Sequence, residues 1–335
     1  MNLQEFTSLV LPKVESTIKE VVDQNIAVHV PELREIFYYH LVLGASQQLK
    51  GKRIRPLLLL LTCNACGGQW EKALLAAAAV ELLHNFSLIH DDVEDHSEIR
   101  RGQPSVWMRW GLSQAINSGD AMFATVFKTI LTQTKNFDSE ITLKAGDILA
   151  NTCLRLVEGQ FLDIANQGKN SIMIDEYWSM IGGKTAALIG CCARVGAVLA
   201  GVSSQQEEYL YQFGYHLGLL FQVQDDLLGI WGDENMMGKS HQSDLIQKKM
   251  TLPVLYGLEL SPRFARRWSQ GSIDPKETAI LTKWLLEDGV LERVKEDMER
   301  INQQIEKNLA LSKCPNKEGL NLLRELFIAI KQRQR

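Results

Sequence analysis

Apolar residues recur every three to four positions along nearly the whole chain, which is the spacing of one face of an α-helix. Strand-like alternation of apolar and polar residues between turn residues is scarce. The pattern therefore predicts an all-α fold. It predicts one helix that begins near Pro56 and further helices over residues 3–24, 32–49, 70–95, 113–133, 138–167, 174–201, 205–231, 250–260, 276–289, 290–312 and 316–332.

The length of 335 residues exceeds that of most single domains. However, no low-complexity stretch and no linker rich in Pro, Gly or Ser divides the chain. We therefore expect one domain over residues 1–335. The hydrophobic fraction of 45% and the charged fraction of 23% are ordinary for a globular protein with a sizeable core, so disorder is not expected.

The formal net charge of −4 gives no electrostatic reason to expect a nucleic-acid partner. No cationic and apolar segment opens the chain, so we expect no secretory signal. The longest apolar stretch, residues 186–202, contains Arg194 and is shorter than a spanning helix. It predicts a buried core helix, and we expect no transmembrane segment.

The six cysteines lie mostly within apolar helical patterns and lack the spacing of a secreted disulfide scaffold. We expect reduced, buried thiols and a cytoplasmic protein. Cys63 and Cys66 form a Cys-x-x-Cys pair, but a tetrahedral metal site needs two more ligands and the chain has no second such pair. A metal or redox site there is therefore the less favoured interpretation.

An acidic cluster stands at the end of the helix predicted over residues 70–95. Asp91 and Asp95 are four residues apart and share a helix face, with Asp92 one step around. Carboxylates this close repel one another unless a cation is present, and hard oxygen ligands of this kind suit Mg²⁺ that also binds substrate phosphates. The alternative is a solvated acidic helix end without a ligand.

A second acidic pair, Asp225 and Asp226, follows Gln222 at the end of another apolar helical run. Two acidic helix ends that faced each other across a helical bundle would hold Mg²⁺ around a diphosphate. Taken alone, the pair is also compatible with an ordinary helix terminus.

Cationic residues accompany both acidic pairs. His84 lies seven residues before Asp91, which places the two side chains about 20° apart on an ideal helix. Arg and Lys side chains bind phosphate oxygens well, although each cluster alone is also compatible with a solvated surface, and His84 with a core histidine. The candidates are Lys52, Arg53 and Arg55 in a turn before a helix, Arg100 and Arg101, and Lys184, Lys239, Lys248 and Lys249 in polar junctions.

Several motifs follow one another in a fixed order: Gly51-Lys-Arg-Ile-Arg-Pro56, Asp91-Asp-x-x-Asp95 with Arg100-Arg-Gly102, Glu158-Gly-Gln160 with Asp163, Lys184-Thr185, Phe221-Gln222 with Asp225-Asp226, and Gly238-Lys239 before Ser243-Asp244-Leu245. In this order they resemble the trans-isoprenyl diphosphate synthase family, also called polyprenyl synthetases, over most of the chain. The resemblance implies a single-domain helical bundle around a central prenyl cavity. It implies condensation of isopentenyl diphosphate with allylic diphosphates, three Mg²⁺ ions per active site, and a homodimer.

The resemblance also implies roles for individual residues. Gly229 stands where the second motif usually ends in a third aspartate, which puts its full metal affinity in doubt. The implied metal ligands are Asp91, Asp92, Asp95, Asp225 and Asp226; the implied contacts of isopentenyl diphosphate are Lys52, Arg55, His84 and Arg101; those of the allylic diphosphate are Arg100, Lys184, Lys239 and Lys249; and Thr185 and Gln222 are implied to line the reacting centre.

The expected reaction needs positive charge to neutralise the departing diphosphate and an apolar cavity for the allylic cation. The released pyrophosphate is expected to take the proton, so no side-chain base is assigned. In the family, the residues five and four positions before the first aspartate, here Phe86 and Ser87, limit product length. An aromatic followed by a small residue resembles geranylgeranyl synthases, which favours a C20 product over C15. Plain core packing of Phe86, or a limit set by Leu82 and Leu83, are the alternatives.

Three other functions remain open from the sequence. A class I terpene cyclase shares the first aspartate motif and the helical fold, but leaves the cationic turn at Lys52 and Arg55 unexplained. A non-catalytic partner subunit of a heteromeric synthase, or a helical scaffold, would not need both cationic sets. For the homodimer, the helix over residues 113–133, with Met122, Phe123 and Phe127, is the expected interface.

Overall fold

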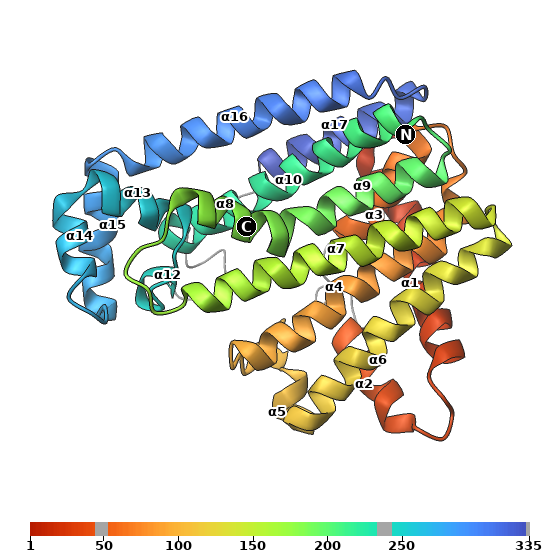
Figure 1. The fold of residues 1–335 in the computed structure, drawn as a ribbon, viewed down its shortest axis with the longest axis horizontal. Coiled ribbons are helices and arrows are strands. Elements are labelled where there is room, and N and C mark those ends of the chain that lie inside the picture. The colour runs from red at the N-terminus through yellow and green to blue at the C-terminus, as the bar shows by residue number, and fades with distance from the viewer. Residues whose placement is uncertain (44–52, 233–242, 333–335) are drawn as a thin grey trace. The chain divides into compact units, whose positions relative to one another are not determined.

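The computed structural model describes residues 1–43, 53–232 and 243–332, and Figure 1 shows its fold. Among these residues the strands are limited to one short antiparallel hairpin, so the predicted all-α fold is confirmed. The α-helices are α1 (Leu3–Asn25), α2 (Pro31–Leu41), α3 (Ile54–Ala65), α4 (Leu74–Glu94), α5 (Val106–Trp110), α6 (Leu112–Leu131), α7 (Ser139–Asn166), α8 (Ile174–Ile181), α9 (Ala187–Leu199), α10 (Ser204–Trp231), α12 (Ser243–Ile246), α13 (Leu252–Leu260), α14 (Pro262–Trp268), α15 (Thr278–Glu287), α16 (Val290–Leu311) and α17 (Lys317–Lys331). The other elements are the 3₁₀-helices η1 (Trp70–Ala73), η2 (Thr132–Lys135) and η4 (Pro275–Glu277), the π-helix η3 (Gly182–Ala186), and the strands β1 (Ile99–Arg100) and β2 (Gln103–Pro104).

The contacts between residues divide the chain into two compact units, each drawn from several stretches. Helices α7, α9, α10 and α17 contribute residues to both units. The expectation of a single domain stays a prediction. The first unit consists of Met1–Cys153, Cys191–Glu208 and Lys313–Glu325, and the second of Leu154–Gly190, Tyr209–Ser312 and Leu326–Arg335.

The first unit is centred on α4. This helix is apolar almost all round and packs along α6, with further contacts to α1 and α3 (Figure 1). A helix that is hydrophobic on all faces is stable only where neighbours cover every face. The run of alanines over Ala76–Ala79 is fully buried, and small side chains of this kind let neighbouring helices approach closely. The core of this unit therefore fixes α4, whose end carries the first acidic cluster.

The second unit has its core around α13, which packs against α16, α14 and α8. Its largest fully buried side chains include Tyr177, Phe213, Phe264 and Trp268. The rings of Phe264 and Trp268 stack with their centroids 5.5 Å apart. Burial of aromatic side chains of this size stabilises a core by roughly 2–3 kcal/mol each. The long helix α10, which carries the second acidic pair, contributes most of its length to this unit.

Local sequence sets several helix ends. Asn2 and Glu5 form a capping box at the start of α1, and Pro31 occupies the first turn of α2. The prediction of a helix over residues 32–49 is wrong at its end: α2 stops at Leu41, because Val42 adopts a left-handed conformation with φ 55°. The short helix α14, which begins at Pro262, was also not predicted.

Two apolar helical stretches in the described residues are long enough to cross a membrane by length and composition, Trp70–Glu94 and Ile174–Leu199. Within the structure, 61% and 83% of their apolar windows are buried. Core helices of globular proteins have the same property. The second stretch includes α9, where the sequence predicted a buried core helix.

Candidate functional site

The first acidic cluster lies at the carboxyl end of α4, in the first unit. Asp91 and Asp92 are in the last turn, and Asp95 is the C-cap and is exposed. Arg100 donates from Nε and Nη2 to Asp92 Oδ1 at 2.9 and 2.5 Å, and from Nη2 to Asp91 Oδ2 at 3.3 Å. Burial raises the pKa of the Asp92 carboxyl although Arg100 opposes this shift. Arg100 thus lies directly against two carboxylates of the cluster.

The carboxylates of this cluster fit Mg²⁺. Among the described residues, the buried Oδ2 atom of Asp92 has no hydrogen-bond partner, so one oxygen of the cluster is desolvated without compensation. No group of three His, Cys, Asp or Glu side chains in the described residues is arranged to hold a metal by itself. Mg²⁺ typically takes one or two carboxylates together with waters and substrate phosphates. The donor set therefore suits an ion that arrives with a diphosphate.

The hairpin of β1 and β2 presents the two arginines. Its register pairs Arg100 with Gln103, which leaves Arg101 and Gly102 as a two-residue turn with φ 53° and 73°. Positive φ at both positions is the signature of a type I′ turn. Glycine adopts this conformation freely, but Arg101 does so at a cost that its side-chain bonds offset. Arg101 donates from Nη1 to His40 O at 2.8 Å and from Nη2 to Asn85 Oδ1 at 3.2 Å.

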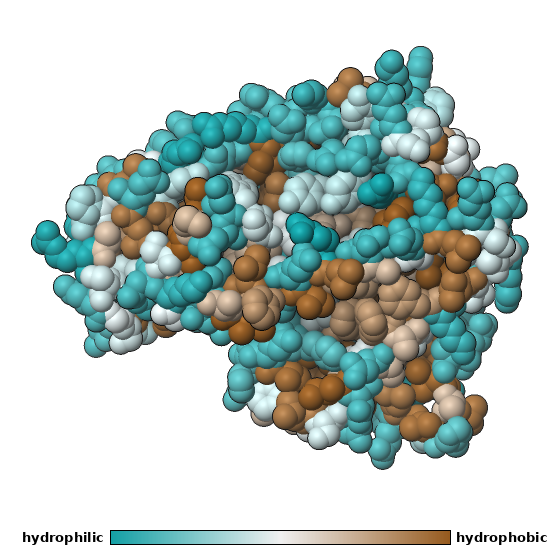
Figure 2. Space-filling model, in the orientation of Figure 1, coloured by the Kyte–Doolittle hydropathy of each residue, from teal (hydrophilic) through white to brown (hydrophobic). Residues whose placement is uncertain are grey.

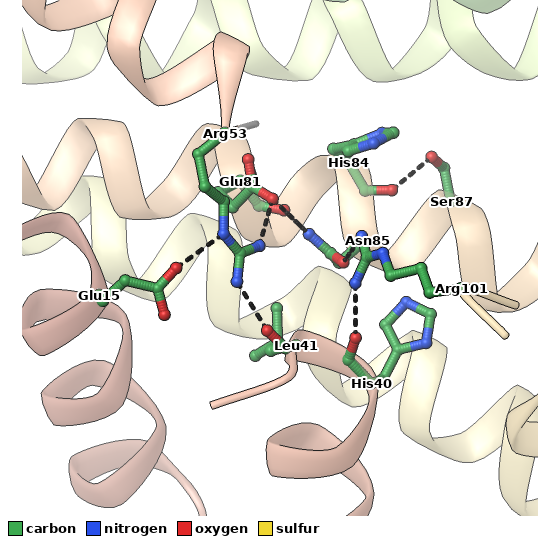
Figure 3. Close-up of polar contacts among 9 residues, drawn as sticks. All are labelled: Glu15, His40, Leu41, Arg53, Glu81, His84, Asn85, Ser87 and Arg101. Carbon is green, nitrogen blue, oxygen red and sulfur yellow. Dashed lines mark hydrogen bonds and ion pairs between the residues drawn. The ribbon is translucent and has the colours of Figure 1, made fainter. Parts of the chain in front are cut away.

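The arginines of the cationic turn before α3 differ in burial. Arg53 is buried and donates to Glu15 Oε1 at 2.8 Å, to Glu81 Oε1 at 2.5 Å and to Leu41 O at 2.6 Å (Figure 3). The interpretation of Arg53 as one of three phosphate-binding cations in this turn is therefore wrong. Arg55, half-buried in the first turn of α3, remains a candidate. Lys52 lies outside the described residues.

His84, on α4, lies close enough to Arg55 and Arg101 for their charges to act on it, the grouping that the family resemblance implied. Burial lowers the pKa of its imidazole well below the ordinary value, and the positive charges of Arg55 and Arg101 lower it further. Burial, together with the positive charge of Arg101, lowers the pKa of His40 to about 3. Both rings are thus neutral near pH 7, and a neutral imidazole N–H is still a hydrogen-bond donor.

Phe86 and Ser87 occupy the α4 turn before the aspartates. Phe86 is buried, and its ring lies 4.9 Å from that of Phe123 on α6 and 5.7 Å from that of His90. The Ser87 hydroxyl donates to His84 O at 2.8 Å. Phe86 is thus fixed by the packing of α4 on α6, and its role in product length stays a prediction.

In the second unit, Asp226 forms the centre of a hydrogen-bonded network. Its carboxylate accepts from Tyr177 Oη at 2.6 Å and from Gln222 Nε2 and Leu252 N at 3.0 Å each. Thr185 Oγ1 donates to Gln222 Oε1 at 2.8 Å. Burial raises the pKa of Asp226 to about 7, because desolvation outweighs these hydrogen bonds. The structure thus brings Thr185 of one motif together with Gln222 and Asp226 of another.

Lys184 lies on the π-helical segment η3, next to α7. Its ammonium pairs with Asp163 Oδ2 at 2.6 Å. A Cβ atom at Gly159 would lie 2.1 Å from Lys184 N, so only glycine allows this approach of backbones. π-helical turns within α-helices are frequent at functional sites. The Glu158-Gly-Gln160 motif therefore serves, through its glycine, to seat the segment that carries Lys184 and Thr185.

Gly229 lies one turn after Asp225, and its surroundings explain why it has no side chain. A Cβ atom there would lie 2.0 Å from Oδ2 of Asp244, which extends from α12. The Asp244 side chain is only 14% exposed and pairs with Lys249 Nζ at 3.9 Å. A carboxylate from another helix thus occupies the space beside the missing third aspartate. Lys239 lies outside the described residues.

Sequence reasoning missed four residues that hold the candidates in place: Glu81, Asn85, Tyr177 and Asp244. Asn85 and Glu81 lie on the same helix as His84, but nothing in the apolar pattern separates them from solvated polar residues. Tyr177 lies 49 residues from Asp226, and only the fold brings them together. Asp244 belongs to a recognised motif, but nothing in its spacing indicates that it lies against Gly229.

Comparisons with known proteins agree on one family. The sequence model of the family described as polyprenyl synthetase matches residues 38–280. A geranylgeranyl diphosphate synthase of Methanosarcina mazei is 36% identical over 280 residues, 83% of this chain and 86% of the relative. A (2E,6E)-farnesyl diphosphate synthase of Mycobacterium bovis is 38% identical over 251 residues, 73% of this chain and 68% of the relative.

A solved structure gives the same result for the fold. The crystal structure of geranylgeranyl pyrophosphate synthetase from Pyrococcus horikoshii Ot3 matches with a TM-score of 0.88 and 28% identity, over 98% of this chain and 99% of that one. The resemblance predicted from the motifs is therefore confirmed. Because the family model spans most of the sequence, the chain belongs to the polyprenyl synthetase family of prenyltransferases.

Proposed function

We propose that this short-chain prenyltransferase condenses isopentenyl diphosphate with allylic diphosphates to give a linear prenyl diphosphate, with geranylgeranyl diphosphate (C20) as the main product and farnesyl diphosphate (C15) as the shorter alternative. The observation that carries the proposal is the pairing of Arg100 with Asp91 and Asp92, with Arg101 on the same hairpin turn. Arg100 pairs with both carboxylates. If Mg²⁺ bound these carboxylates instead, the guanidinium of Arg100 would be available beside the metal to bind a diphosphate.

In this proposal the cationic residues of the first unit hold diphosphate oxygens. Arg101, Arg55 and His84 bind isopentenyl diphosphate, together with Lys52, and Arg100 binds the allylic diphosphate. Arginine forks match phosphate geometry, and neutral His84 adds a donor without extra charge. Holding the two substrates in a fixed orientation accelerates attack of the isopentenyl double bond on the allylic carbon.

The proposed metal ligands are Asp91, Asp92, Asp95, Asp225 and Asp226, with three Mg²⁺ ions per active site. When bound, Mg²⁺ supplies positive charge that neutralises the departing diphosphate. Asp226 already accepts hydrogen bonds from neutral donors, so its carboxylate keeps a fixed orientation. Further proposed contacts of the substrates come from Lys184, Thr185, Gln222, Lys239 and Lys249.

Product length tests the proposal. Purified protein with Mg²⁺ and labelled isopentenyl diphosphate is incubated separately with dimethylallyl, geranyl and farnesyl diphosphates, and the dephosphorylated products are sized by chromatography. A linear C20 alcohol is expected. Phe86→Ala should lengthen the product by at least one C5 unit, because a void replaces the ring between α4 and α6.

A matched variant separates the two candidate limits. If Leu82→Ala lengthens the product while Phe86→Ala does not, the limit lies another turn along α4. If a single allylic primer is cyclised and none is extended, the chain acts as a terpene cyclase. If the purified chain turns over none of the primers, it acts as one subunit of a heteromeric synthase.

The proposed enzyme is a cytoplasmic homodimer formed by one domain per chain. The helix expected at the interface, α6, buries Met122 completely within its own unit, which rules this side chain out as a contact. An apolar stripe on α7 supports a partner surface: Leu154 is 64%, Val157 61% and Phe161 70% exposed (Figure 2). Sedimentation of the wild type and of Phe161→Glu tests this, because a charge on the stripe should dissociate a dimer.

A further inference from the structure

A buried network in the first unit joins three helices to the hairpin that carries Arg101 (Figure 3). Arg53 bridges Glu15 on α1, the Leu41 carbonyl at the end of α2, and Glu81 on α4. A buried charge is stable only if paired and hydrogen-bonded, and Arg53 meets both conditions. Arg53 therefore fixes where these three helices meet.

The end of α2 receives two arginines side by side. The Leu41 carbonyl accepts from Arg53, and the neighbouring His40 carbonyl accepts from Arg101 Nη1 at 2.8 Å. The last carbonyls of a helix lack partners within the helix and carry the negative end of its dipole. This anchor holds one side of the Arg101 guanidinium.

Asn85 holds the other side. Its Nδ2 atom donates to both Oε1 and the backbone carbonyl of Glu81, at 2.8 Å each, while its Oδ1 atom accepts from Arg101 Nη2 at 3.2 Å. A carboxylate and a carbonyl only accept hydrogen bonds, and a guanidinium only donates them. The amide therefore has one permissible orientation, which directs its oxygen at Arg101. Asn85 is fully buried, so no exposed alternative competes.

We propose that Asn85 is a positioning residue for isopentenyl diphosphate: its side-chain oxygen fixes the Arg101 guanidinium, and Glu81, itself held by Arg53, fixes the orientation of Asn85. The proposal rests on the proposed role of Arg101 in binding that substrate. Asn85 itself touches no substrate in this scheme. Its removal loosens Arg101, whose turn conformation is unfavourable for a residue other than glycine.

The test measures each substrate separately. Asn85→Ala should raise the KM for isopentenyl diphosphate, and its dissociation constant by calorimetry, about tenfold, the value of one hydrogen bond to a charged group. The KM for the allylic diphosphate and kcat should change less than twofold. Asn85→Asp keeps an oxygen acceptor for Arg101 but loses the donor to Glu81 and adds a like charge beside it, so it should not restore the affinity. The matched control is Asn308→Ala, because Asn308 is also buried and donates to the carbonyl four residues earlier, Gln304 O, at 2.8 Å.

Arg101→Ala and the double variant with Asn85→Ala separate this proposal from the one on which it rests. If Arg101→Ala raises the KM for isopentenyl diphosphate and Asn85→Ala adds nothing to it, the positioning role is supported. If Arg101→Ala has that effect but Asn85→Ala alone has none, the positioning role fails and the role of Arg101 stands. If Arg101→Ala leaves the KM unchanged, the substrate assignment fails. Equal losses for both substrates in Asn85→Ala and Asn85→Asp would mark a merely structural residue.

Discussion

The two units differ in the charge that surrounds their buried titratable groups. In the first, the positive charges of Arg100 and Arg101 act on the buried, neutral imidazoles of His40 and His84. In the second, the carboxylate of Asp226 is surrounded by neutral donors, Tyr177, Gln222 and the Leu252 N–H.

Burial favours the neutral form of both groups, so it lowers the pKa of a base and raises that of an acid. Burial, with the arginine charges, lowers the pKa of His40 to about 3, while burial raises that of Asp226 to about 7 against the hydrogen bonds of its neutral donors. The first region disfavours further positive charge and is suited to an anion. In the second, burial disfavours the negative charge of Asp226 unless a cation compensates it.

The largest expected effect concerns the acidic cluster of the first unit. Asp91→Ala should lower kcat by about 10²–10³-fold, because it removes a proposed ligand of the Mg²⁺ that would neutralise the departing diphosphate. Steady-state kinetics at saturating Mg²⁺ checks this. Glu94→Ala is the matched control, an exposed acid on the same helix end. Equal, small losses in both variants would mean that the cluster is only a solvated helix terminus.

The opposite pKa shifts predict opposite pH dependences of stability. Asp226 has a pKa of about 7 in the folded protein and an ordinary value of 3.8, so its contribution to stability falls as pH rises from about 4 to 7. His40 has a pKa of about 3 against an ordinary 6.5, so its contribution rises with pH from about 3 to 6.5. Each slope is at most about 1.4 kcal/mol per pH unit.

Urea unfolding of the metal-free protein between pH 4 and 8 measures both slopes. The wild type is compared with Asp226→Asn and with His40→Leu, each of which removes one titrating group. The free energy of unfolding of the wild type minus that of Asp226→Asn should decrease as pH rises. The free energy of unfolding of the wild type minus that of His40→Leu should increase. Two differences of the same sign would contradict the contrast between the regions.

Restoring the family's third aspartate should harm this protein. Gly229→Asp places a Cβ atom 2.0 Å from Asp244 Oδ2 and adds a like charge beside it. We expect a loss of about 1–3 kcal/mol in the free energy of unfolding, measured by urea denaturation. Gly229→Asp combined with Asp244→Ala relieves both the overlap and the repulsion and should recover most of the loss. A more stable single variant would show that Asp244 does not occupy this space.

The smallest expected effect comes from Tyr177→Phe, which removes one donor to Asp226 and keeps the buried ring. The free energy of unfolding at pH 7 should fall by about 1–2 kcal/mol. Tyr39→Phe is the control, because its hydroxyl donates to Pro104 O in an exposed position. Equal losses in the two variants would show that the hydrogen bond from Tyr177 to Asp226 stabilises the fold no more than an exposed one.

Much of the fold and part of the site could be predicted because their signals are local. Helical periodicity gave α7, α10, α16 and α17 to within about two residues of their ends. The end of α2 was missed because a left-handed Val42 has no signature in an apolar pattern. Helix geometry predicted that His84 and Asp91 share one face of a helix, whereas its proximity to Arg55 and Arg101 was implied only by the family motifs.

What the sequence by itself determined is the all-α class, the family and the position of each charged motif on its helix, because periodicity and motif spacing are properties of neighbouring residues. Only the tertiary structure decided which charges are already paired. Arg53 and Arg55 look alike in the cationic turn, but the fold buries Arg53 between Glu15 and Glu81 and leaves Arg55 half-buried. Asp225 and Asp226 are adjacent, yet only Asp226 is fully buried, with Tyr177 beside it. Burial and pairing depend on residues distant in sequence, so their effects on charge appear only in the folded chain.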